Sequence, residues 1–233
     1  MNKQEFDEHA KNYKEVLNQS IGFSGEDSNY FAEYKIRDLH HELALRVIDT
    51  SSNLRLMDFG CGVGASIPYL RQYFPNSELV GVDVSEESLQ LARSLNGRHA
   101  TFLKLFEKGL PTEVEALDAA YAMCVFHHID EAEHMELLTN IRSRLKPNGL
   151  MMIYEHNPLN PLTVRVVNQC PFDANAKLIA AKLMAKRCQM AGFRDVLVKY
   201  RVFFPRFLRM FRFAEGLLTW LPLGGQYYVR CLA

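Results

Sequence analysis

Residues 53–66 read NLRLMDFGCGVGAS, and this stretch decides which fold the chain adopts. Its apolar start predicts a short buried strand that ends at Asp58. Gly60, Gly62 and Gly64 follow at alternate positions, and the small residues after them predict the start of a helix. Such a turn presents bare backbone N–H groups and a positive helix end, to which a polar or anionic group can bind. The stretch therefore predicts a ligand-binding turn, although a tight turn that binds nothing is the alternative.

A second acidic residue supports the ligand-binding interpretation. Residues 78–83 read ELVGVD and predict a strand that ends in Asp83, about 20 residues after the glycine turn. A carboxylate at the tip of the neighbouring parallel strand can accept hydrogen bonds from both ribose hydroxyls of an adenosine. The spacing DxGxGxG differs from the GxGxxG fingerprint of dinucleotide-binding proteins. With the acid at Asp58, it resembles motif I of the class I S-adenosylmethionine-dependent methyltransferases.

Three further segments resemble the small-molecule members of this family, so that the resemblance covers about residues 6–155. The segment FDEHAKNY at 6–13 is similar to the FDxxAxxY motif near the start of many of them. The segments VFHHID at 125–130 and LKPNGLMMIYEHN at 145–157 resemble the family's motifs after the fourth strand and along the fifth. His128 stands at the position of the family's recurring histidine.

The resemblance implies S-adenosylmethionine as the cofactor and a set of residues that bind it. The methionyl end would lie on the glycine turn, the ammonium group at Asp58 and the ribose at Asp83. The family commonly places an acid four residues before Leu-Pro to meet the adenine, but Phe106 stands there in this chain. Backbone groups or stacking on that ring would serve instead. The predicted cofactor-binding residues are Tyr13, Asp58, Gly60, Cys61, Gly62, Gly64, Asp83, Val84, Phe106 and Cys124.

The chain as a whole predicts an α/β fold: a Rossmann-like, doubly wound sheet of seven strands with N-terminal capping helices. The resemblance implies that the last strand is inserted antiparallel between the fifth and the sixth. The predicted strands are 54–58, 78–83, 100–105, 118–126, 149–154, 194–204 and 226–232, and the main predicted helices are 4–19, 27–49, 85–94, 130–145 and 177–190. We interpret 1–233 as a single domain, with cap helices in 1–52, a cofactor-binding core in 53–155, and the acceptor-side loop and C-terminal strands in 156–233.

The helix predicted over 27–49 begins with a group of aromatic and basic side chains. Tyr30, Phe31, Tyr34 and Lys35 precede the first strand, where the family places helices that cap the cofactor. Plain packing onto the sheet is the alternative for each of them. Tyr13 is the best candidate for a cap contact, because it belongs to the motif at 6–13.

Composition excludes several classes of function. Lys+Arg and Asp+Glu number 27 each in 233 residues, so no global charge would attract nucleic acid. The five cysteines are scattered and form no CxxC pair, which argues against a disulfide framework or a cysteine zinc site. The polar start and the lack of a long apolar run argue against a signal peptide and a membrane span. We therefore expect a reduced, cytoplasmic, globular protein.

Three histidines lie at the edge of the predicted sheet where open sheets bind ligands. His127 and His128 end the fourth predicted strand, and His156 follows the fifth beside Glu155. We predict the three histidines as catalytic residues that take a proton from a hydroxyl or amine acceptor, with Glu155 as a further candidate. A histidine that only bonds backbone near the cofactor is the alternative. Because neighbouring side chains of a strand point to opposite sides, His127 and His128 would not chelate an ion together, and we predict no metal.

These features predict a methyltransferase that acts on a small or conjugated metabolite, by O- or N-methylation through in-line displacement. The cofactor carries the reactivity, so the protein would align nucleophile and methyl group and exclude water. The loop at 155–175 leaves the fifth strand above the site and would face the acceptor. Two alternatives stay open: a nicotinamide-dependent oxidoreductase, which shares the strand, glycine and acid arrangement, and a non-catalytic adenosyl-binding partner subunit.

Residues 205–225, PRFLRMFRFAEGLLTWLPLGG, form an insertion between the last two predicted strands. Five apolar residues would share one face of a helix, with three arginines beside it. These are Phe207, Phe211, Ala214, Leu218 and Leu221, and Arg206, Arg209 and Arg212. Such a helix would pack on the flank of the sheet, serve as a lid or homodimer contact, or touch a membrane surface that carries a lipid- or glycan-linked acceptor.

Overall fold

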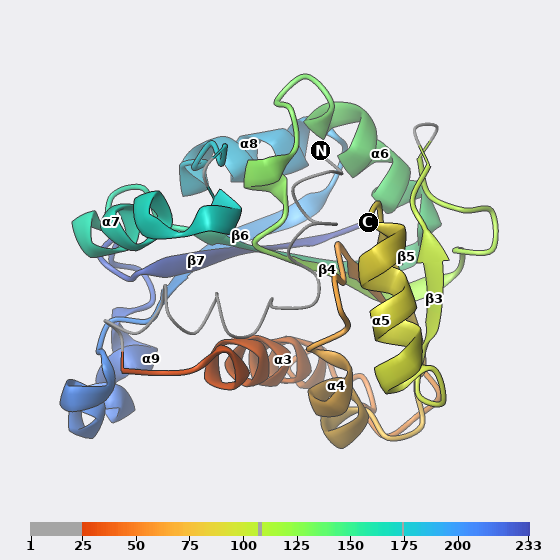
Figure 1. The fold of residues 1–233 in the computed structure, drawn as a ribbon, viewed down its shortest axis with the longest axis horizontal. Helices are drawn as coiled ribbons and strands as arrows, with labels where there is room; N and C mark the ends of the chain where they lie inside the picture. The colour runs from red at the N-terminus through yellow and green to blue at the C-terminus, as the bar shows by residue number, and fades with distance from the viewer. Residues whose placement is uncertain (1–24, 107–108, 174) are drawn as a thin grey trace.

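The structure is a computed structural model, and it describes residues 25–106, 109–173 and 175–233 (Figure 1). One sheet contains seven strands in the order β3-β2-β1-β4-β5-β7-β6. β7 runs antiparallel between β5 and β6, whereas β1 to β5 pair in parallel. The strands are β1 Arg55–Phe59, β2 Glu78–Asp83, β3 Thr101–Lys104, β4 Leu117–Met123, β5 Leu145–His156, β6 Arg194–Arg201 and β7 Gln226–Leu232. The predicted Rossmann-like sheet with an antiparallel last strand is confirmed.

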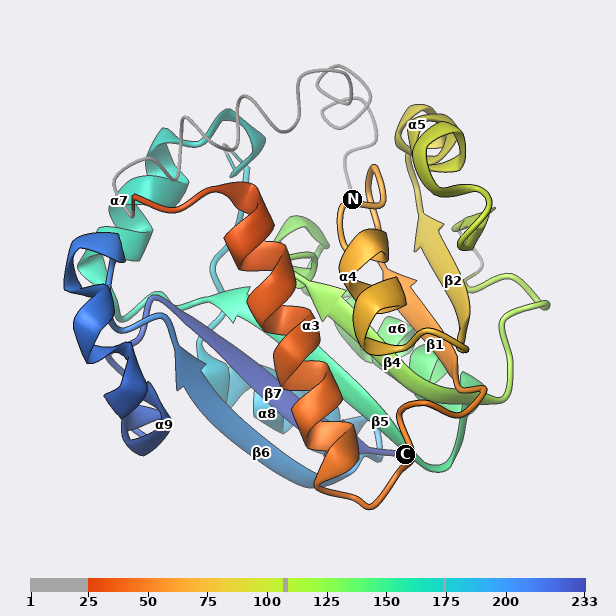
Figure 2. The same cartoon turned by 90° about the horizontal axis from the view of Figure 1, so that it is seen from below.

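Helices cover both faces of the sheet (Figures 1 and 2). One face carries α3 Ser28–Ala44, α4 Ile67–Tyr73 and α5 Glu86–Asn96, and the other carries α6 His134–Arg144 and α8 Ala181–Met190. Shorter elements follow the carboxyl ends of the strands: η3 Phe126–His128 after β4, α7 Pro161–Gln169 and η4 Pro171–Asp173 after β5, and η5 Arg206–Ala214 and α9 Glu215–Leu218 after β6.

The middle strands are apolar throughout because helices bury both of their faces. Alternate residues of a strand point to opposite faces, so one apolar run supplies two cores. In β5, Leu150 and Met152 pack into the core under α3, α4 and α5. Met151 and Ile153 pack into the core under α6 and α8. The carboxyl ends of β1, β2 and β4 therefore meet at one edge, where the predicted site residues stand.

Some element bounds differ from the prediction for a local backbone reason. α3 ends at Ala44 rather than at residue 49, and Val47 just after it adopts a φ of 60°. β4 ends at Met123 rather than at residue 126, because Cys124 has a φ of 58° and leaves the strand conformation. The predicted helix over 4–19 lies outside the described residues.

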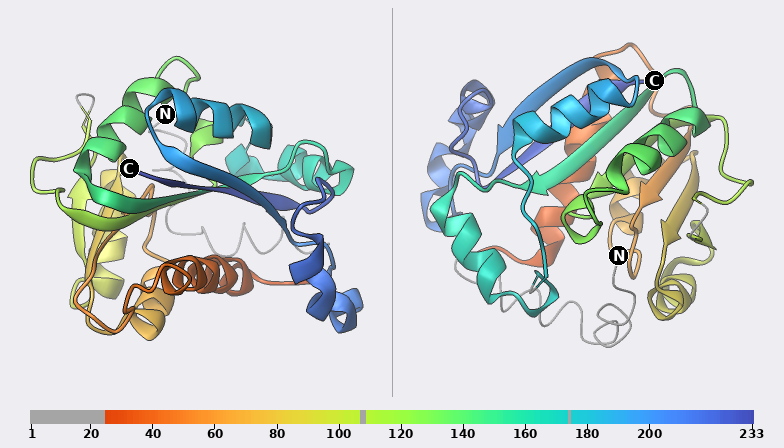
Figure 3. Two further views of the ribbon diagram at one scale, coloured as in Figure 1. Left: turned by 180° about the vertical axis from the view of Figure 1, so that it is seen from behind. Right: turned by 90° about the horizontal axis from the view of Figure 1, so that it is seen from above.

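Residues 206–214 form 3₁₀ turns interrupted by non-helical backbone at Leu208, so the predicted α-helical apolar face is wrong here. The side chains of Phe207, Met210 and Phe213 are 74%, 71% and 86% exposed. Figure 3 shows the segment standing off the edge of the sheet, which does not support packing on its flank. In the described ranges, none of the helices has both the length and the apolar character needed to cross a membrane.

Candidate active site

The turn after β1 contains three glycines whose φ angles are positive, namely 74° at Gly60, 50° at Gly62 and 74° at Gly64. A Cβ on Gly60 would lie 2.5 Å from a methyl carbon of Val125, whereas a Cβ on Gly62 would meet no atom of the described residues within 4 Å. The carbonyl of Gly64 accepts a hydrogen bond from Asn96 Nδ2 at 3.1 Å. Gly60 and Gly64 thus permit close packing behind the turn, while Gly62 leaves open space in front of it.

Asp83 ends β2 beside this turn, where the sequence predicts it. Gly62 N donates to its Oδ2 at 2.8 Å, and Ser85 N donates to its Oδ1 at 2.9 Å. The carboxylate is buried, so backbone groups of two loops fix its position. Val84 follows it and is half-buried, whereas Phe106 is 61% exposed. Stacking of Phe106 on an adenine therefore stays a prediction.

Asp58 is a buried acid within β1. Its carboxylate accepts a hydrogen bond from the Ser66 hydroxyl, which in turn accepts one from the Tyr121 hydroxyl at 3.3 Å. Burial raises the pKa of Asp58 to about 6, although the Ser66 hydrogen bond opposes this shift. A cationic group placed beside the carboxylate would favour its charged form. The side chain is therefore suited to bind an ammonium group.

A cavity of about 290 Å³ joins the glycine turn to the segments that follow β4, β5 and β6. Among the predicted cofactor-binding residues, Asp58, Gly60, Cys61, Gly62 and Cys124 line it. Gly64, Asp83, Val84 and Phe106 lie outside its lining, and Tyr13 lies outside the described residues. Of the predicted catalytic histidines, His156 lines the cavity. The structure thus brings five of the ten predicted cofactor-binding residues and one of the three predicted catalytic histidines to one space.

The far wall of the cavity is apolar. α3 contributes Phe31, α7 contributes Leu162 and Val166, and the segment after β6 contributes Val202 and Phe203. α3 precedes the cofactor-binding core in the sequence, whereas α7 and the segment after β6 follow it. The wall supplies a surface for an apolar ligand, and the aromatic side chains predicted to cap the cofactor contribute only Phe31 to it.

Cys124 lines the cavity at the end of β4 and has three polar neighbours. Lys35 Nζ lies 3.3 Å from its Sγ, and Gln226 Nε2 lies 3.8 Å from Sγ and 3.4 Å from His156 Nδ1. Burial raises the pKa of the Cys124 thiol, but Lys35 and His156 outweigh it and lower the pKa to about 7. The thiol is therefore partly ionised at neutral pH. Sequence reasoning missed Gln226, because only the antiparallel insertion of β7 brings it here.

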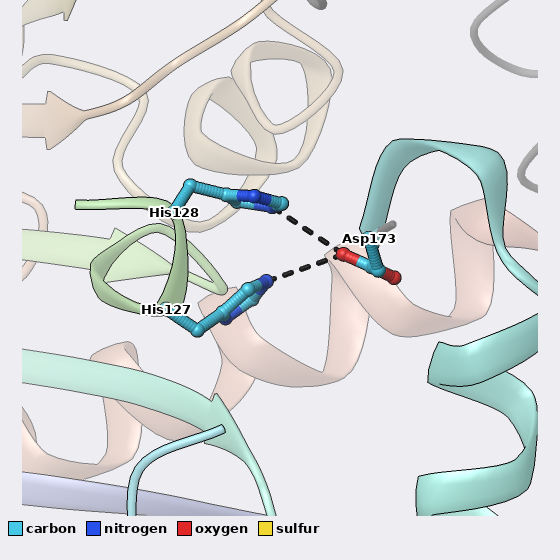
Figure 4. Close-up of side chains that lie close together, drawn as sticks. All are labelled: His127, His128 and Asp173. Atoms are coloured by element: carbon cyan, nitrogen blue, oxygen red, sulfur yellow. Dashed lines mark hydrogen bonds and ion pairs between the residues drawn. The ribbon is translucent and has the colours of Figure 1, made fainter. Parts of the chain in front are cut away.

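His127 and His128 are not among the residues that line the cavity. The ring of His127 adjoins that of His156, and the two ring centroids are 5.3 Å apart. His127 Nδ1 bonds Glu155, and its Nε2 lies 3.3 Å from Asp173 Oδ1. The same oxygen lies 3.3 Å from His128 Nε2, and Figure 4 shows both rings converging on it. The expectation that the two rings point to opposite sides is wrong, because both residues belong to η3 and not to a strand.

The charges of this cluster depend on its burial. Burial lowers the pKa of His127, but the carboxylates of Glu155 and Asp173 outweigh it and raise the pKa to about 10. Burial raises the pKa of Glu155, but His127 outweighs it and holds the pKa below its usual value. Burial lowers the pKa of His128. Two carboxylates therefore share one cationic ring.

A glycine turn with buried acids at the carboxyl ends of β1 and β2, facing an apolar wall across one cavity, defines a cofactor-binding protein of the Rossmann-like class. Residues 57–151 match the family model described as a methyltransferase domain. Proteins with similar sequences and solved structures with a similar fold support this match.

Among sequence relatives, trans-aconitate 2-methyltransferase of Azoarcus sp. (strain BH72) is 25% identical over 177 residues, which are 75% of this chain and 68% of that protein. An uncharacterized methyltransferase of Synechocystis sp. is 26% identical over 52% of this chain. The chain spans 56% of the length of that relative, and 28% of the length of an uncharacterized protein of Synechococcus sp..

Among solved structures, a methyltransferase of Thermotoga maritima described as a possible histamine N-methyltransferase has a TM-score of 0.65 and 18% identity, with 98% of each chain covered. Phosphoethanolamine N-methyltransferase 2 of Haemonchus contortus, in complex with S-adenosylmethionine, has a TM-score of 0.58 and 16% identity over 94% of this chain and 59% of that one. The domain match over residues 57–151 and the fold confirm the predicted likeness to the class I S-adenosylmethionine-dependent methyltransferases, and with it the predicted cofactor.

Proposed function

We propose that this chain transfers a methyl group from S-adenosylmethionine to an oxygen or nitrogen atom of a small or conjugated acceptor, by in-line displacement. The observation that carries the proposal is the cavity that the glycine turn shares with the apolar wall. Because both sets of residues face one space, a donor on the turn and an acceptor against the wall can be aligned there. The lining comes from the cap, the core and the acceptor side, so we propose that 1–233 acts as one domain.

The residues present suit the cofactor. S-adenosylmethionine, when bound, supplies an electrophilic methyl group. In our proposal, Asp58 holds its ammonium group, the open backbone at Gly62 accommodates its methionyl end, and Asp83 holds the ribose. The raised pKa of Asp58 supports the first assignment, since a buried carboxylate of this kind gains from a cationic partner. Contacts from Tyr13, Val84 and Phe106 stay predictions.

His156 is the proposed general base of the reaction, because it lines the cavity and takes its place beside Cys124 and Gln226. A hydroxyl or amine acceptor has to lose a proton, and an imidazole that faces the acceptor is suited to take it. The tilted ring of His127 adjoins His156 and would position it. His128 does not line the cavity, so a direct role for His128 would require the acceptor to reach past His156.

The surface beside the cavity suggests an acceptor attached to a lipid. Pro205 lines the cavity, and seven large apolar side chains are exposed just after it. They are Phe207, Met210, Phe211, Phe213, Leu217, Trp220 and Leu223, which we call the apolar rim. Arg206 and Arg209 are exposed on the same segment. Aromatic and apolar residues flanked by arginines suit the surface of an anionic membrane.

Two further expectations accompany this proposal. The five free cysteines support a reducing, cytoplasmic location. A relative named for trans-aconitate and a structural neighbour described as a possible histamine N-methyltransferase support a small-molecule acceptor. A homodimer that buries the apolar rim is the alternative to a membrane contact, and sedimentation velocity of the wild type would reveal it.

Radiolabelled S-adenosylmethionine tests the proposed activity. The wild-type chain is incubated with cofactor and either a lipid extract or an aqueous extract of cells, and labelled product and S-adenosylhomocysteine are measured. We expect acceptor-dependent turnover with the lipid extract. His156→Asn should reduce the rate at least about tenfold without changing cofactor affinity, while the exposed His99→Asn serves as the matched control. Cofactor binding without turnover on any acceptor would favour a non-catalytic adenosyl-binding subunit.

A further inference from the structure

His127, His128 and Asp173 present three potential metal-ligand atoms to one point (Figure 4). The two histidines come from η3 and the aspartate from η4, and their ligand atoms all lie within 4.8 Å of one another. The sequence argues against a chelating pair only if both histidines continue a strand. The turn at η3 removes that condition and directs both Nε2 atoms to the same carboxylate oxygen.

The distances between these atoms suit ligands of one ion. Asp173 Oδ1 lies 3.3 Å from His127 Nε2 and 3.3 Å from His128 Nε2. Hydrogen bonds between nitrogen and oxygen are usually about 2.7–3.2 Å long, so both contacts are long for hydrogen bonds. Zinc bonds to histidine and carboxylate are about 2.0–2.2 Å, which places neighbouring ligand atoms of a tetrahedral site about 3.3–3.5 Å apart.

The surroundings of the cluster match those of a metal site. Glu155 binds the other ring nitrogen of His127 and also accepts a hydrogen bond from Phe126 N at 2.8 Å. Metal-binding histidines commonly hold a carboxylate at their second nitrogen in this way, which fixes the ring and its tautomer. Glu155 and Asp173 together bring two formal negative charges, and a divalent ion that displaces the proton from His127 Nε2 balances them.

We propose that His127 Nε2, His128 Nε2 and Asp173 Oδ1 bind one divalent transition-metal ion of the zinc class. Solvent reaches the site, because the side chains of His128 and Asp173 are 10% and 12% exposed. Three protein ligands leave one position of a tetrahedral ion for water. The ion fastens the segment after α7 to the end of β4, and thereby holds the wall of the cavity that α7 supplies. The proposal concerns metal binding and does not depend on the proposed methyl transfer.

Metal titration of the full, untagged chain tests this proposal. After treatment with a chelator, the wild type is titrated with Zn²⁺ by calorimetry and with Co²⁺ by visible absorption. We expect one equivalent of Zn²⁺ with a dissociation constant of micromolar or below. Co²⁺ should give the visible bands of a four-coordinate nitrogen and oxygen site, without the intense near-ultraviolet absorption of a cobalt–thiolate bond.

Two variants locate the ion. His128→Gln and Asp173→Asn should each weaken Zn²⁺ binding at least about tenfold, while His99→Gln, at an exposed histidine, should bind like the wild type. A wild type that binds no Zn²⁺ would overturn the proposal and leave a hydrogen-bonded cluster. Undiminished binding in both variants, or a thiolate band with Co²⁺, would place the ion elsewhere and overturn it too. If a variant does not fold, the wild-type Co²⁺ spectrum still decides.

Discussion

At the scale of single residues, the glycines of the turn after β1 are not equivalent. A Cβ at Gly60 would meet Val125, whereas one at Gly62 would enter the cavity. We predict that Gly60→Ala lowers the free energy of unfolding by about 2–4 kcal/mol, from strain at positive φ plus overpacking. Gly62→Ala should lower it by only about 1–2 kcal/mol, yet weaken S-adenosylmethionine binding more than tenfold.

Urea denaturation and calorimetry of the two variants measure both effects. Each variant serves as the control for the other, because both place the same methyl group at a positive φ. Equal losses of stability, or unchanged cofactor affinity in Gly62→Ala, would contradict the separate roles assigned to the two glycines.

Asp58 should make stability depend on pH. Because its pKa is raised from 3.8 to about 6, its stabilising contribution is complete below 3.8 and is lost as the pH rises through 6. Asp58→Asn keeps a neutral group at every pH, so the variant should gain stability relative to the wild type between pH 4 and pH 8, on the order of 1–3 kcal/mol. Urea denaturation at several pH values measures the difference. Parallel profiles for the two proteins would refute the burial argument.

Cys124 should be the reactive thiol of the chain. Its pKa of about 7 predicts that iodoacetamide labelling of Cys124 accelerates as the pH rises through 7, since only the thiolate reacts. Lys35→Met should move the midpoint toward the ordinary value near 8.5. Cys61 is an internal control, because burial holds the pKa of its thiol well above the usual range. Mass spectrometry assigns the sites, and a wild-type midpoint at or above 8.5 would exclude the role of Lys35.

At the scale of elements, η5 exposes large apolar side chains that a helix of this composition would usually bury. Phe207 and Phe213 are on its open side, and neither contributes to a core. We predict that the wild type co-sediments with vesicles that contain anionic lipid, and that Phe207→Ser/Phe213→Ser does not. The thermal midpoint should hardly change, because these side chains are exposed in the folded chain.

A matched variant makes the vesicle test specific. Leu95→Ser/Met190→Ser removes two exposed apolar side chains that belong to α5 and α8 rather than to η5. It should sediment like the wild type. Loss of sedimentation in both double variants would indicate nonspecific adhesion, and no sedimentation of the wild type would remove the membrane contact from the proposal.

At the scale of the whole molecule, ion pairs join α3 to the strands that come last in the chain. Arg201 makes two hydrogen bonds to Asp38, at 2.8 and 3.0 Å, and Lys199 Nζ lies 2.6 Å from Glu42 Oε1. α3 also supplies Lys35 to the cavity. The cap helix α3, near the start of the chain, is thus held in place by β6, near the end of the chain.

Breaking one of these pairs should destabilise the fold. Arg201→Met leaves Asp38 unpaired, and burial already raises the pKa of that carboxyl. We predict a loss of about 2 kcal/mol or more, less than for a fully buried pair because both side chains touch solvent. Asp38→Leu/Arg201→Met should recover at least about 1 kcal/mol, and Lys186→Met, at an exposed lysine, should have no effect. A double variant no more stable than the single one would contradict the account.

Much of this fold could be predicted from the sequence, because apolar runs and glycine spacing are local features. The acids Asp58 and Asp83 were predicted at strand ends, and they lie there. The turn at η3 was not predicted, because it depends on the positive φ of a single residue, Cys124. Asp173 stands 46 residues from His127, and no local pattern predicts that a loop returns it to the same point. Long-range pairing, rather than composition, accounts for what sequence reasoning missed.

The place of β7 between β5 and β6 has a consequence for the nascent chain. His156 at the end of β5 pairs with Gln226 of β7, 70 residues later. A ribosome that adds roughly 5–20 residues per second needs about 4–14 s to cover that distance. During this time the outer edge of β5 has no partner, and β6 emerges without a strand to join. Anything that slows translation between 156 and 226 therefore prolongs the period in which an apolar strand edge is open to aggregation.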